Sequence, residues 1–343
     1  EQSMKFTHAF APSPLCSPSR CVIETGLMPF RNGAHKFGTP IRESVRTMPQ
    51  YMKELGYYTA HIGKFHHAPA DKFPYDTVMD DPAKAPSFLA DYDGERPLFL
   101  VVCSNKPHTP WADNTIYDPQ EIPLPGNSVD TPQTRRDRAD YYMDVTLMDR
   151  LLGSVLDAAD EHGFEENSLF LYTTDQGADW PFGKWCLYDQ GIRVPFLVRW
   201  PGVIPEGSET DAMISFADLL PTLMDVAGAE PPGNIDGRSF SDVLKGEADS
   251  FRDCVFATHT GNENGPPGAP NHSPARCIRT PTHKYILNLA PSRLFQTHIT
   301  MEPRPNNPHY RAFWQTWEEK AKEDDRARRI VNAYRHRPVE ELL

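Results

Sequence analysis

The sequence predicts an α/β protein with a central mixed, mostly parallel sheet sandwiched by helices and a smaller C-terminal α+β subdomain. Short apolar runs alternate with amphipathic stretches along the first part of the 343 residues, as strands alternate with helices packed on a sheet. Beyond residue 230 the chain becomes rich in Gly, Pro, Asn and Asp, and this alternation weakens. We therefore expect two domains, over residues 1–230 and 231–343.

Strands are expected where short apolar or β-branched runs stand between turn residues. The expected strands lie at 57–62, 98–102, 169–173, 194–200 and 255–258, with a strand-like run at 277–289 that Pro281 interrupts. Helices are expected where apolar residues recur on one helical face. They lie at 45–55, with Ser44 as cap and Gly56 after the end, at 139–163, at 219–226 with Asp218 as cap, and from about Tyr310 to Tyr334.

Composition excludes several classes of function. The chain has 35 Lys and Arg against 47 Asp and Glu, and a net charge of −12 opposes long-range attraction to nucleic acid. No run approaches the ~20 apolar residues that span a bilayer, so no membrane span is expected. Six cysteines without CxxC spacing argue against a zinc site and a dense disulfide scaffold. An anionic ligand therefore has to be bound by a local cluster of cations.

The run Cys16-Ser17-Pro18-Ser19-Arg20 predicts the start of a helix that continues to Thr25 and ends at Gly26. Ser17 is suited to the N-cap, and Pro18 to the first helical position. Cys16 would then lie at a helix N-terminus, where free N–H groups attract anions and the pKa of a thiol falls. Taken alone, the pattern is equally compatible with a buried structural cysteine beside a capped helix.

Two histidine-containing segments directly follow expected strands, where ligands collect in open α/β sheets. Gly63–His67 contains Lys64 two positions before His66, and Ser104–His108 contains Lys106 two positions before His108. In the first segment, a cation and an imidazole at this spacing can contact one anionic group together. Alone, the first segment is also typical of an exposed loop, and the second of a Pro-containing turn with an exposed His.

A third segment, Thr174–Gly177, follows the strand expected at 169–173, and Lys184 stands a few residues further on. Asp175 and Gln176 offer two oxygen ligands, which suit Ca²⁺ or Mg²⁺ better than zinc. An Asp that caps a turn is the ordinary alternative.

Together these motifs resemble the sulfatase family of the alkaline phosphatase superfamily, whose most specific signature is Cys-x-Pro-Ser-Arg followed by the Thr25-Gly26 pair. The resemblance implies an alkaline phosphatase-like fold and hydrolysis of sulfate esters or sulfamates on carbohydrates. It implies that Cys16 is converted to formylglycine by a formylglycine-generating or anaerobic sulfatase-maturating enzyme. It further implies a divalent metal, Ca²⁺ or else Mg²⁺, and no nucleic-acid partner.

The resemblance also implies a role for each motif residue. Cys16 is the precursor of the nucleophile and a metal ligand, and Arg20 helps to position and neutralise it. Lys64 and Lys184 bind sulfate, and His108 donates to the sulfate or the leaving oxygen. His66 binds the formylglycine hydroxyl, with His67 as the alternative. Asp175 and Gln176 ligate the metal, and Gln176 replaces the usual Asn. Further candidates for contact with the substrate are Lys106, His67, His259 and Arg279. No motif fixes His259 and Arg279, which could reach the sugar, and ordinary loop residues are the alternative for these two.

Several longer runs resemble the heparan N-sulfatase-like branch of the family and its bacterial members: 63–76, 96–108, 182–188 and 276–289. This implies a glycosaminoglycan-type substrate, with sulfamate on glucosamine as first candidate, and a periplasmic or secreted location. In the family two further metal-binding acids come from a first strand upstream of the cysteine, yet only 15 residues precede Cys16. We therefore expect a chain truncated at both ends. A phosphonate or phosphate ester hydrolase, and an inactive glycan-binding fragment, are the alternatives.

Overall fold

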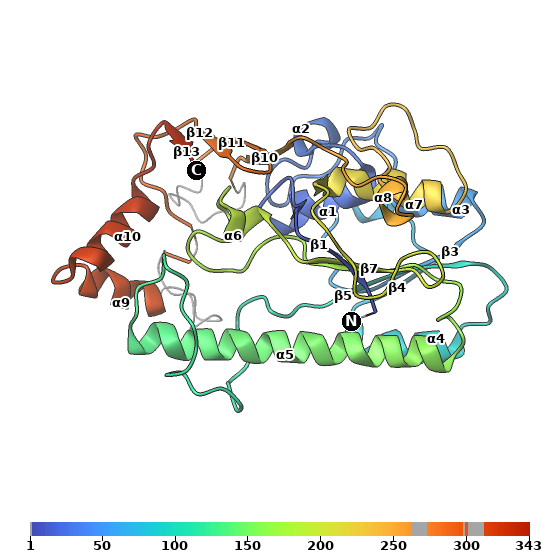
Figure 1. Cartoon of the computed structure of the whole chain (residues 1–343), viewed down its shortest axis with the longest axis horizontal. Coiled ribbons are helices and arrows are strands. Elements are labelled where there is room, and N and C mark those ends of the chain that lie inside the picture. Colours follow the sequence, from blue (N-terminus) through green and yellow to red (C-terminus); the bar gives the residue numbers. More distant parts are fainter. Residues whose placement is uncertain (1, 262–272, 298, 301–311) are drawn as a thin grey trace.

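The computed structural model describes residues 2–261, 273–297, 299–300 and 312–343. The expected α/β class is confirmed, because mixed sheets lie between two layers of helices (Figure 1). One layer consists of α4 (Ala85–Asp91) and the long α5 (Pro132–Glu161), and the other contains α1 (Cys16–Thr25), α3 (Met48–Glu54), α7 (Leu219–Val226) and α8 (Ser241–Leu244).

The strands between these layers pair into separate groups. β3 (Tyr58–Gly63) lies at the centre of a parallel sheet, with β4 (Thr77–Met79) on one side and β5 (Leu98–Cys103) on the other. A second, mixed sheet has the order β6-β7-β1-β8, and β2 pairs with β9 beside it. Their bounds are Phe170–Thr173 for β6, Phe196–Arg199 for β7, Met4–Phe6 for β1, Glu209–Thr210 for β8, Ala9–Phe10 for β2 and Ile214–Ser215 for β9.

β5 and β6 are edge strands of these two sheets, and all their residues are half-buried although nearly all are apolar. The carboxyl ends of β3, β5 and β6 lead directly into the three segments that the sequence singles out. The ends of these three strands therefore bring the three segments to one region of the molecule.

The expected strands at 57–62, 98–102, 169–173 and 255–258 are confirmed to within one residue at each end. The strand expected at 194–200 is shorter, because β7 begins only after Pro195. Proline has no backbone N–H to give to a ladder, so it stands before a strand more readily than inside it.

Three expected helix starts are wrong, each because another residue caps the helix. α1 begins at Cys16 itself with Leu15 at the N-cap position, so Ser17 lies in the first turn. α3 begins after Thr47, whose backbone N–H donates to the Gln50 side chain in a capping box, and Ser44 does not cap it. α5 begins seven residues before the expected start at 139, because Thr131 caps it and a proline occupies its first position.

α7 has the expected bounds, but Asp218 does not cap it. The Asp218 carboxylate instead accepts from the backbone N–H groups of Ser215 and Arg238 and pairs with Arg252. Shorter helices complete the first part: α2 (Pro29–Asn32), α6 (Asp189–Ile192) and 3-10 turns at Ala70–Lys72, Pro82–Lys84 and Phe216–Asp218.

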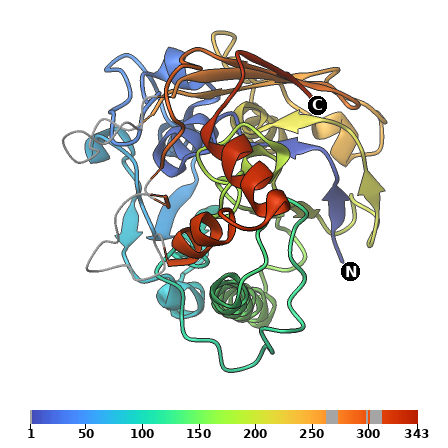
Figure 2. The same ribbon diagram turned by 90° about the vertical axis from the view of Figure 1, so that its left-hand side faces the viewer.

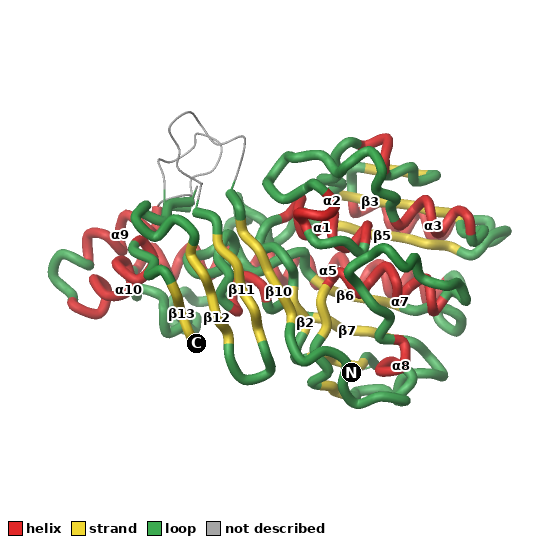
Figure 3. Tube along the Cα trace, turned by 90° about the horizontal axis from the view of Figure 1, so that it is seen from above, coloured by secondary structure: helices red, strands yellow, loops and turns green. Residues whose placement is uncertain are grey.

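The C-terminal part contains an antiparallel sheet of β10 (Val255–His259), β11 (Ala275–Arg279), β12 (Lys284–Asn288) and β13 (Glu340–Leu342), seen side by side in Figure 3. The run expected as one strand at 277–289 is therefore two strands of a hairpin, with Pro281 in its turn. The proline lacks a ladder donor, which fits the turn.

The helix expected from Tyr310 to Tyr334 is two helices, α9 (Ala312–Lys320) and α10 (Asp325–Arg335), and Tyr310 lies outside the described residues. Asp324 separates them, because its side chain accepts from the Ala327 N–H and caps α10.

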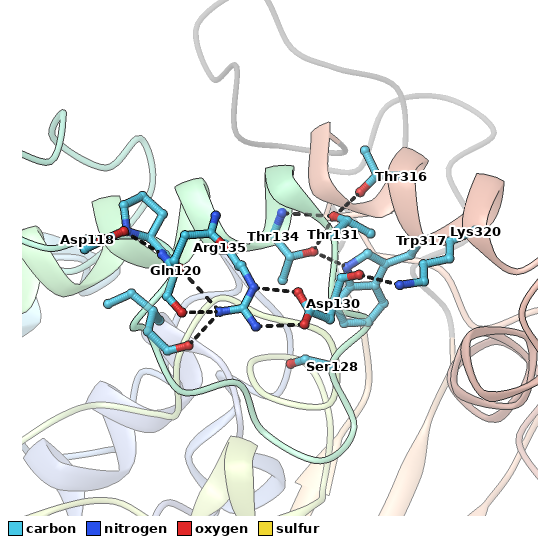
Figure 4. A network of polar contacts seen from close by, with 12 residues as sticks. Asp118, Gln120, Ser128, Asp130, Thr131, Thr134, Arg135, Thr316, Trp317 and Lys320 are labelled. Carbon is cyan, nitrogen blue, oxygen red and sulfur yellow. Dashed lines mark hydrogen bonds and ion pairs between the residues drawn. The ribbon is translucent and has the colours of Figure 1, made fainter.

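α9 packs across the beginning of α5, and α10 packs on α9 (Figure 2). The Trp317 indole N–H donates to the Thr134 hydroxyl over 2.7 Å, and Lys320 donates to the backbone carbonyl of Asp130 over 2.8 Å (Figure 4). Trp314, Trp317 and Tyr334 are fully buried at this contact. The boundary between residues 230 and 231 stays a prediction.

No helix in the described part of the chain combines the length and the apolar character needed to cross a membrane.

Candidate active site

Cys16 lies at the first position of α1 and is buried, with 1% of its surface exposed. The first N–H groups of a helix have no partner within it and carry partial positive charge. Burial by itself raises the pKa of the Cys16 thiol, but the charge of Lys184 and hydrogen bonds from His108 and His66 lower the pKa well below its ordinary value. Residue 16 is therefore placed where negative charge is stabilised.

Two lysines reach this position from different loops. Nζ of Lys64, in the loop after β3, lies 3.7 Å from Sγ of Cys16. Nζ of Lys184, in the loop after β6, lies 3.0 Å from Nε2 of His108. The expected cationic cluster around Cys16 therefore forms.

Both ring nitrogens of His108 have partners. Its Nδ1 lies 2.6 Å from the carbonyl oxygen of Thr109, which can only accept, so Nδ1 carries a proton. Its Nε2 lies 3.0 Å from Nζ of Lys184. Lys184 is held from the other side by Asp179, whose Oδ2 lies 3.4 Å from Nζ and also accepts from the Thr109 hydroxyl.

The Arg20 guanidinium lies one turn beyond Cys16 and joins the ends of three strands. Its Nε donates to Oδ2 of Asp175 over 2.7 Å, after β6. Its Nη1 donates to the carbonyl of Lys64 over 3.0 Å, after β3, and to the thiol of Cys103 over 3.2 Å, at the end of β5. Burial raises the pKa of Asp175, yet Arg20 and Lys64 outweigh it and hold that pKa below its usual value.

Strained backbone is concentrated in the same loops. His66, Phe182 and Trp185 have φ values of +46°, +66° and +74°, a left-handed region that non-glycine residues rarely adopt. At Gly177 the reason for glycine is space, because a Cβ there would meet the carbonyl oxygen of Gln190 at 1.8 Å. Such strain persists only where the surrounding structure enforces it, and it is typical of functional sites.

Two side chains of the loop after β6 have the chemistry of a hard-metal site. Oε1 of Gln176 is buried and has no hydrogen-bond partner among the described residues, and the Asp175 carboxylate is beside it in sequence. Calcium, however, takes ~6–8 oxygens, and no group of three or more His, Cys, Asp or Glu is arranged for a metal in the described ranges. Asp175 and Gln176 fit part of such a site, so we assign no chemical step to a metal.

Models of known protein families match the part of the chain that carries these residues. The family model described as Sulfatase matches residues 1–82 and 72–229, which together are more than half of the chain. The chain belongs to the sulfatase family. A second model, described as the C-terminal part of N-sulphoglucosamine sulphohydrolase, matches residues 177–292.

Curated sulfatases align with most of the chain. An ulvan-active sulfatase of Formosa agariphila is 30% identical over 317 residues, covering 88% of this chain and 62% of that protein. Human N-sulphoglucosamine sulphohydrolase is 27% identical over 318 residues, covering 76% of this chain and 62% of that protein. The chain thus spans about 62% of the length of these two relatives.

Solved structures share the fold. One, described as a complex with its substrate D-glucosamine-2-N,6-O-disulfate, has a TM-score of 0.69 at 20% identity and covers 83% of this chain and 81% of its own. A phosphonate monoester hydrolase from Silicibacter pomeroyi has a TM-score of 0.71 at 21% identity, covering 84% and 80%. At these identities the likeness concerns the fold alone.

Of the residues that the sulfatase motifs single out, the structure gathers most around Cys16. The gathered side chains are Arg20, Lys64, His66, His108, Asp175 and Lys184, with Gln176 beside them. His66 is exposed and contacts Cys16, whereas His67 is buried and stacks on Phe73 at 4.6 Å between ring centres. Only His66, of these two histidines, faces the thiol.

The residues expected at the sugar are less uniformly placed. Lys106 turns toward α5 and pairs with Asp144 at 2.8 Å. Arg279 pairs with Asp189 of α6. His259 is buried with its ring edge-on to Trp185 at 5.8 Å, next to the Lys184 loop.

Asp179 and Cys103 belong to the site but were missed by the sequence reasoning. Asp179 follows Gly177 within the same loop, and its spacing to Lys184 gives no periodic signal. Cys103 is the last residue of β5, where a thiol is read as an ordinary apolar strand residue. No pattern in the sequence indicates that either contacts Lys184 or Arg20.

Proposed function

We propose that this chain forms the catalytic part of a carbohydrate sulfatase, in which residue 16 acts as formylglycine. The observation that carries the proposal is the cluster of Lys64, Lys184, His66 and His108 around a buried Cys16 at a helix N-terminus. This arrangement concentrates positive charge in an acidic chain of net charge −12, which suits one compact anion better than an extended one.

The Cys16 side chain marks the position that formylglycine would occupy in the modified protein. Membership of the sulfatase family implies formylglycine in general, and Cys16 is the residue at that position of the motif. In its hydrated form the residue would carry a hydroxyl, whose oxygen would attack sulfur and whose proton would pass to the adjacent His66 imidazole, as the bond from sulfur to the sugar oxygen or nitrogen breaks. The second hydroxyl of the hydrate would then expel sulfate as the aldehyde re-forms. The helix N-terminus and the Lys64 ammonium stabilise the charge on the attacking oxygen.

His108 and Lys184 are placed to serve the leaving group. The leaving oxygen or nitrogen takes the electron pair of the broken bond and needs a proton. Nζ of Lys184 lies 3.0 Å from Nε2 of His108, so the two groups together can give a proton to a leaving atom that enters between them. Asp179 holds Lys184 in place, with Oδ2 3.4 Å from Nζ.

The family implies a divalent metal, and we propose Asp175 and Gln176 as two of its ligands with residue 16 as a third. Ca²⁺ is the first candidate and Mg²⁺ the second, because both oxygens are hard donors. Melting curves with each cation test this proposal. Gln176→Ala is expected to abolish a Ca²⁺-dependent rise in Tm, whereas Gln190→Ala, at an exposed position, is expected to retain it.

For the substrate we propose a sulfated sugar, with N-sulfated glucosamine tested first. Support comes from the match of residues 177–292 to the C-terminal model of N-sulphoglucosamine sulphohydrolase and from the human relative of that name. Within this proposal His259 and Arg279 stay candidates for the sugar side, as do Lys106 and His67. A periplasmic or secreted location, expected from the family, is tested by cell fractionation.

The decisive experiment combines modification with turnover. The protein is made with a formylglycine-generating or anaerobic maturating enzyme, and residue 16 is analysed by peptide mass spectrometry and by an aldehyde-reactive hydrazide. We expect an aldehyde at position 16, hydrolysis of aryl sulfate and sulfated glucosamine, and loss of turnover in Cys16→Ala.

Three other outcomes would redirect the proposal. Faster hydrolysis of an aryl phosphonate than of the aryl sulfate would indicate a phosphonate or phosphate ester hydrolase. Binding of sulfated glycans without turnover, despite the aldehyde, would indicate a binding protein. An intact thiol at residue 16 after co-expression would remove the proposed nucleophile.

A further inference from the structure

A second group of titratable side chains gathers around the last turn of α1. Glu24 is on the last turn of α1 and only 3% of its surface is exposed. Its Oε1 accepts from the Tyr75 hydroxyl over 2.7 Å and lies 3.7 Å from Nε2 of His67. His61, buried in β3, completes the group, with its ring centre 5.7 Å from that of His67.

Burial disfavours the charged form of each of these groups. Burial raises the pKa of Glu24 to about 7, against the opposing effects of the Tyr75 hydrogen bond and the Arg20 charge. Burial and Arg20 lower the pKa of His67, and they lower that of His61 to about 4. Cys21 on the same helix also faces Glu24. Glu24 and His61 are therefore both neutral between about pH 4 and pH 7.

This buried group is connected to the active site through the chain between Phe65 and His67. Phe65 packs edge-on against His67 at 4.8 Å, and His67 stacks on Phe73 at 4.6 Å. His66 stands between these two anchored residues, in the left-handed conformation with φ of +46°. Its own side chain is exposed and hydrogen-bonds Cys16.

An exposed imidazole on strained backbone needs anchors on both sides to keep one direction. On the C-terminal side of His66 the nearest anchor is His67, whose Nε2 lies 3.7 Å from Oε1 of Glu24, a packing contact rather than a hydrogen bond. Glu24 is on the same helix as Cys16, so this contact ties the imidazole-bearing loop to the helix that carries the nucleophile.

We propose that Glu24 is a positioning residue, which acts through His67 to fix the backbone at His66 and so the direction from which the His66 imidazole meets residue 16. The proposal rests on the proposed function for its kinetic consequence only. The position of His66 is a property of the folded chain, whatever reaction residue 16 carries out.

The variants Glu24→Gln and Glu24→Ala separate this role from simple packing. The amide keeps the shape of the protonated carboxyl and still accepts from Tyr75, so E24Q should keep kcat within about twofold below pH 7. An amide does not ionise, so a fall in kcat between pH 6 and 8 that is caused by ionisation of Glu24 should be absent in E24Q. E24A should lower kcat about tenfold or more with KM changed less than about threefold, because His66 contacts the nucleophile rather than the sugar.

A direct readout uses the unmodified protein with ¹⁵N-labelled histidine. The His66 imidazole signals, assigned from their loss in His66→Gln, should move in E24A and stay in place in E24Q. Thr134→Ala is the matched control: it removes a buried hydrogen bond to Trp317 and should lower stability without moving the His66 signals.

The results separate failure of this proposal from failure of the proposed function. Unchanged His66 signals in E24A, or equal shifts in the Thr134→Ala control, would overturn the positioning role even if the protein is an active sulfatase. Shifted signals in a protein without sulfatase turnover would support positioning and contradict only the proposed reaction. If E24A does not fold, Tyr75→Phe gives the same test, because it removes the hydroxyl that holds Glu24 and keeps the ring.

Discussion

Arg20 and Asp175, 155 positions apart, form a buried ion pair in which Nε donates to Oδ2 over 2.7 Å. Their side chains are only 11% and 14% exposed. The pair joins the helix that begins with Cys16 to the loop that carries Gln176 and Lys184. It therefore sets the distance between the two halves of the active site.

Asp175→Ala is expected to lower the free energy of unfolding by about 3–5 kcal/mol, because it leaves the Arg20 charge buried without its carboxylate. Urea unfolding in the presence of a chelator measures this loss. The exposed pair of Lys5 and Glu209, whose side chains are 58% exposed, is the control. Glu209→Ala should cost less than about 1 kcal/mol, and a comparable loss in both variants would contradict the importance of burial.

Lys184→Met is expected to lower kcat/KM for an aryl sulfate by roughly 100-fold, the usual effect of removing one charge-stabilising donor from an active site. Lys184→Arg should lose less, because it retains the charge but cannot keep the same contacts with His108 and Asp179. Steady-state kinetics on the aldehyde-containing protein provide the measurement. Lys5→Ala, far from the site, should behave as wild type, and wild-type kinetics in Lys184→Met would remove this lysine from the mechanism.

Acid is expected to destabilise the protein below about pH 6.5, through His259 and His61. Burial lowers the pKa of His259 to about 3 and that of His61 to about 4. Because the unfolded chain protonates near 6.5 and the folded one does not, stability is present above pH 6.5 and is lost as the pH falls toward those values.

His259→Phe tests this at the better-packed position, with its ring against Trp185. Between pH 7 and pH 4 the free energy of unfolding should fall by roughly 2–4 kcal/mol less in the variant than in wild type. Urea midpoints at several pH values measure the difference. An exposed histidine, as in His283→Phe, should leave the pH dependence unchanged, and equal slopes in wild type and His259→Phe would exclude His259 as a cause.

Gly177→Ala and Gly153→Ala should have opposite effects. A Cβ at Gly177 would meet the Gln190 carbonyl at 1.8 Å, so the loop with Asp175 and Gln176 must shift. Gly153, inside α5, has open space around it, and alanine there should stabilise the helix by about 0.5–1 kcal/mol. Thermal melts rank the variants, and a Tm for Gly177→Ala at or above wild type would contradict the crowding.

The sequence by itself determined the fold class, the positions of β3, β5, β6 and β10, and the segments of the site. Strands packed in the interior appear in the sequence as apolar runs. Polar residues directly after such runs lie at the edge of the sheet where ligands bind. Lys64, His108 and Asp175 could be found in this way. The family motif at Cys16 then supplied the expected chemistry.

Tertiary structure alone decided which side chains of these segments meet. His66 faces the thiol while its neighbour His67 is buried against Glu24, and Lys106 turns to Asp144 on α5. Asp179 joins Lys184, and Cys103 joins Arg20. The physical reason is that each direction depends on a partner elsewhere in the fold and on local φ values, and neither leaves a periodic trace in the sequence.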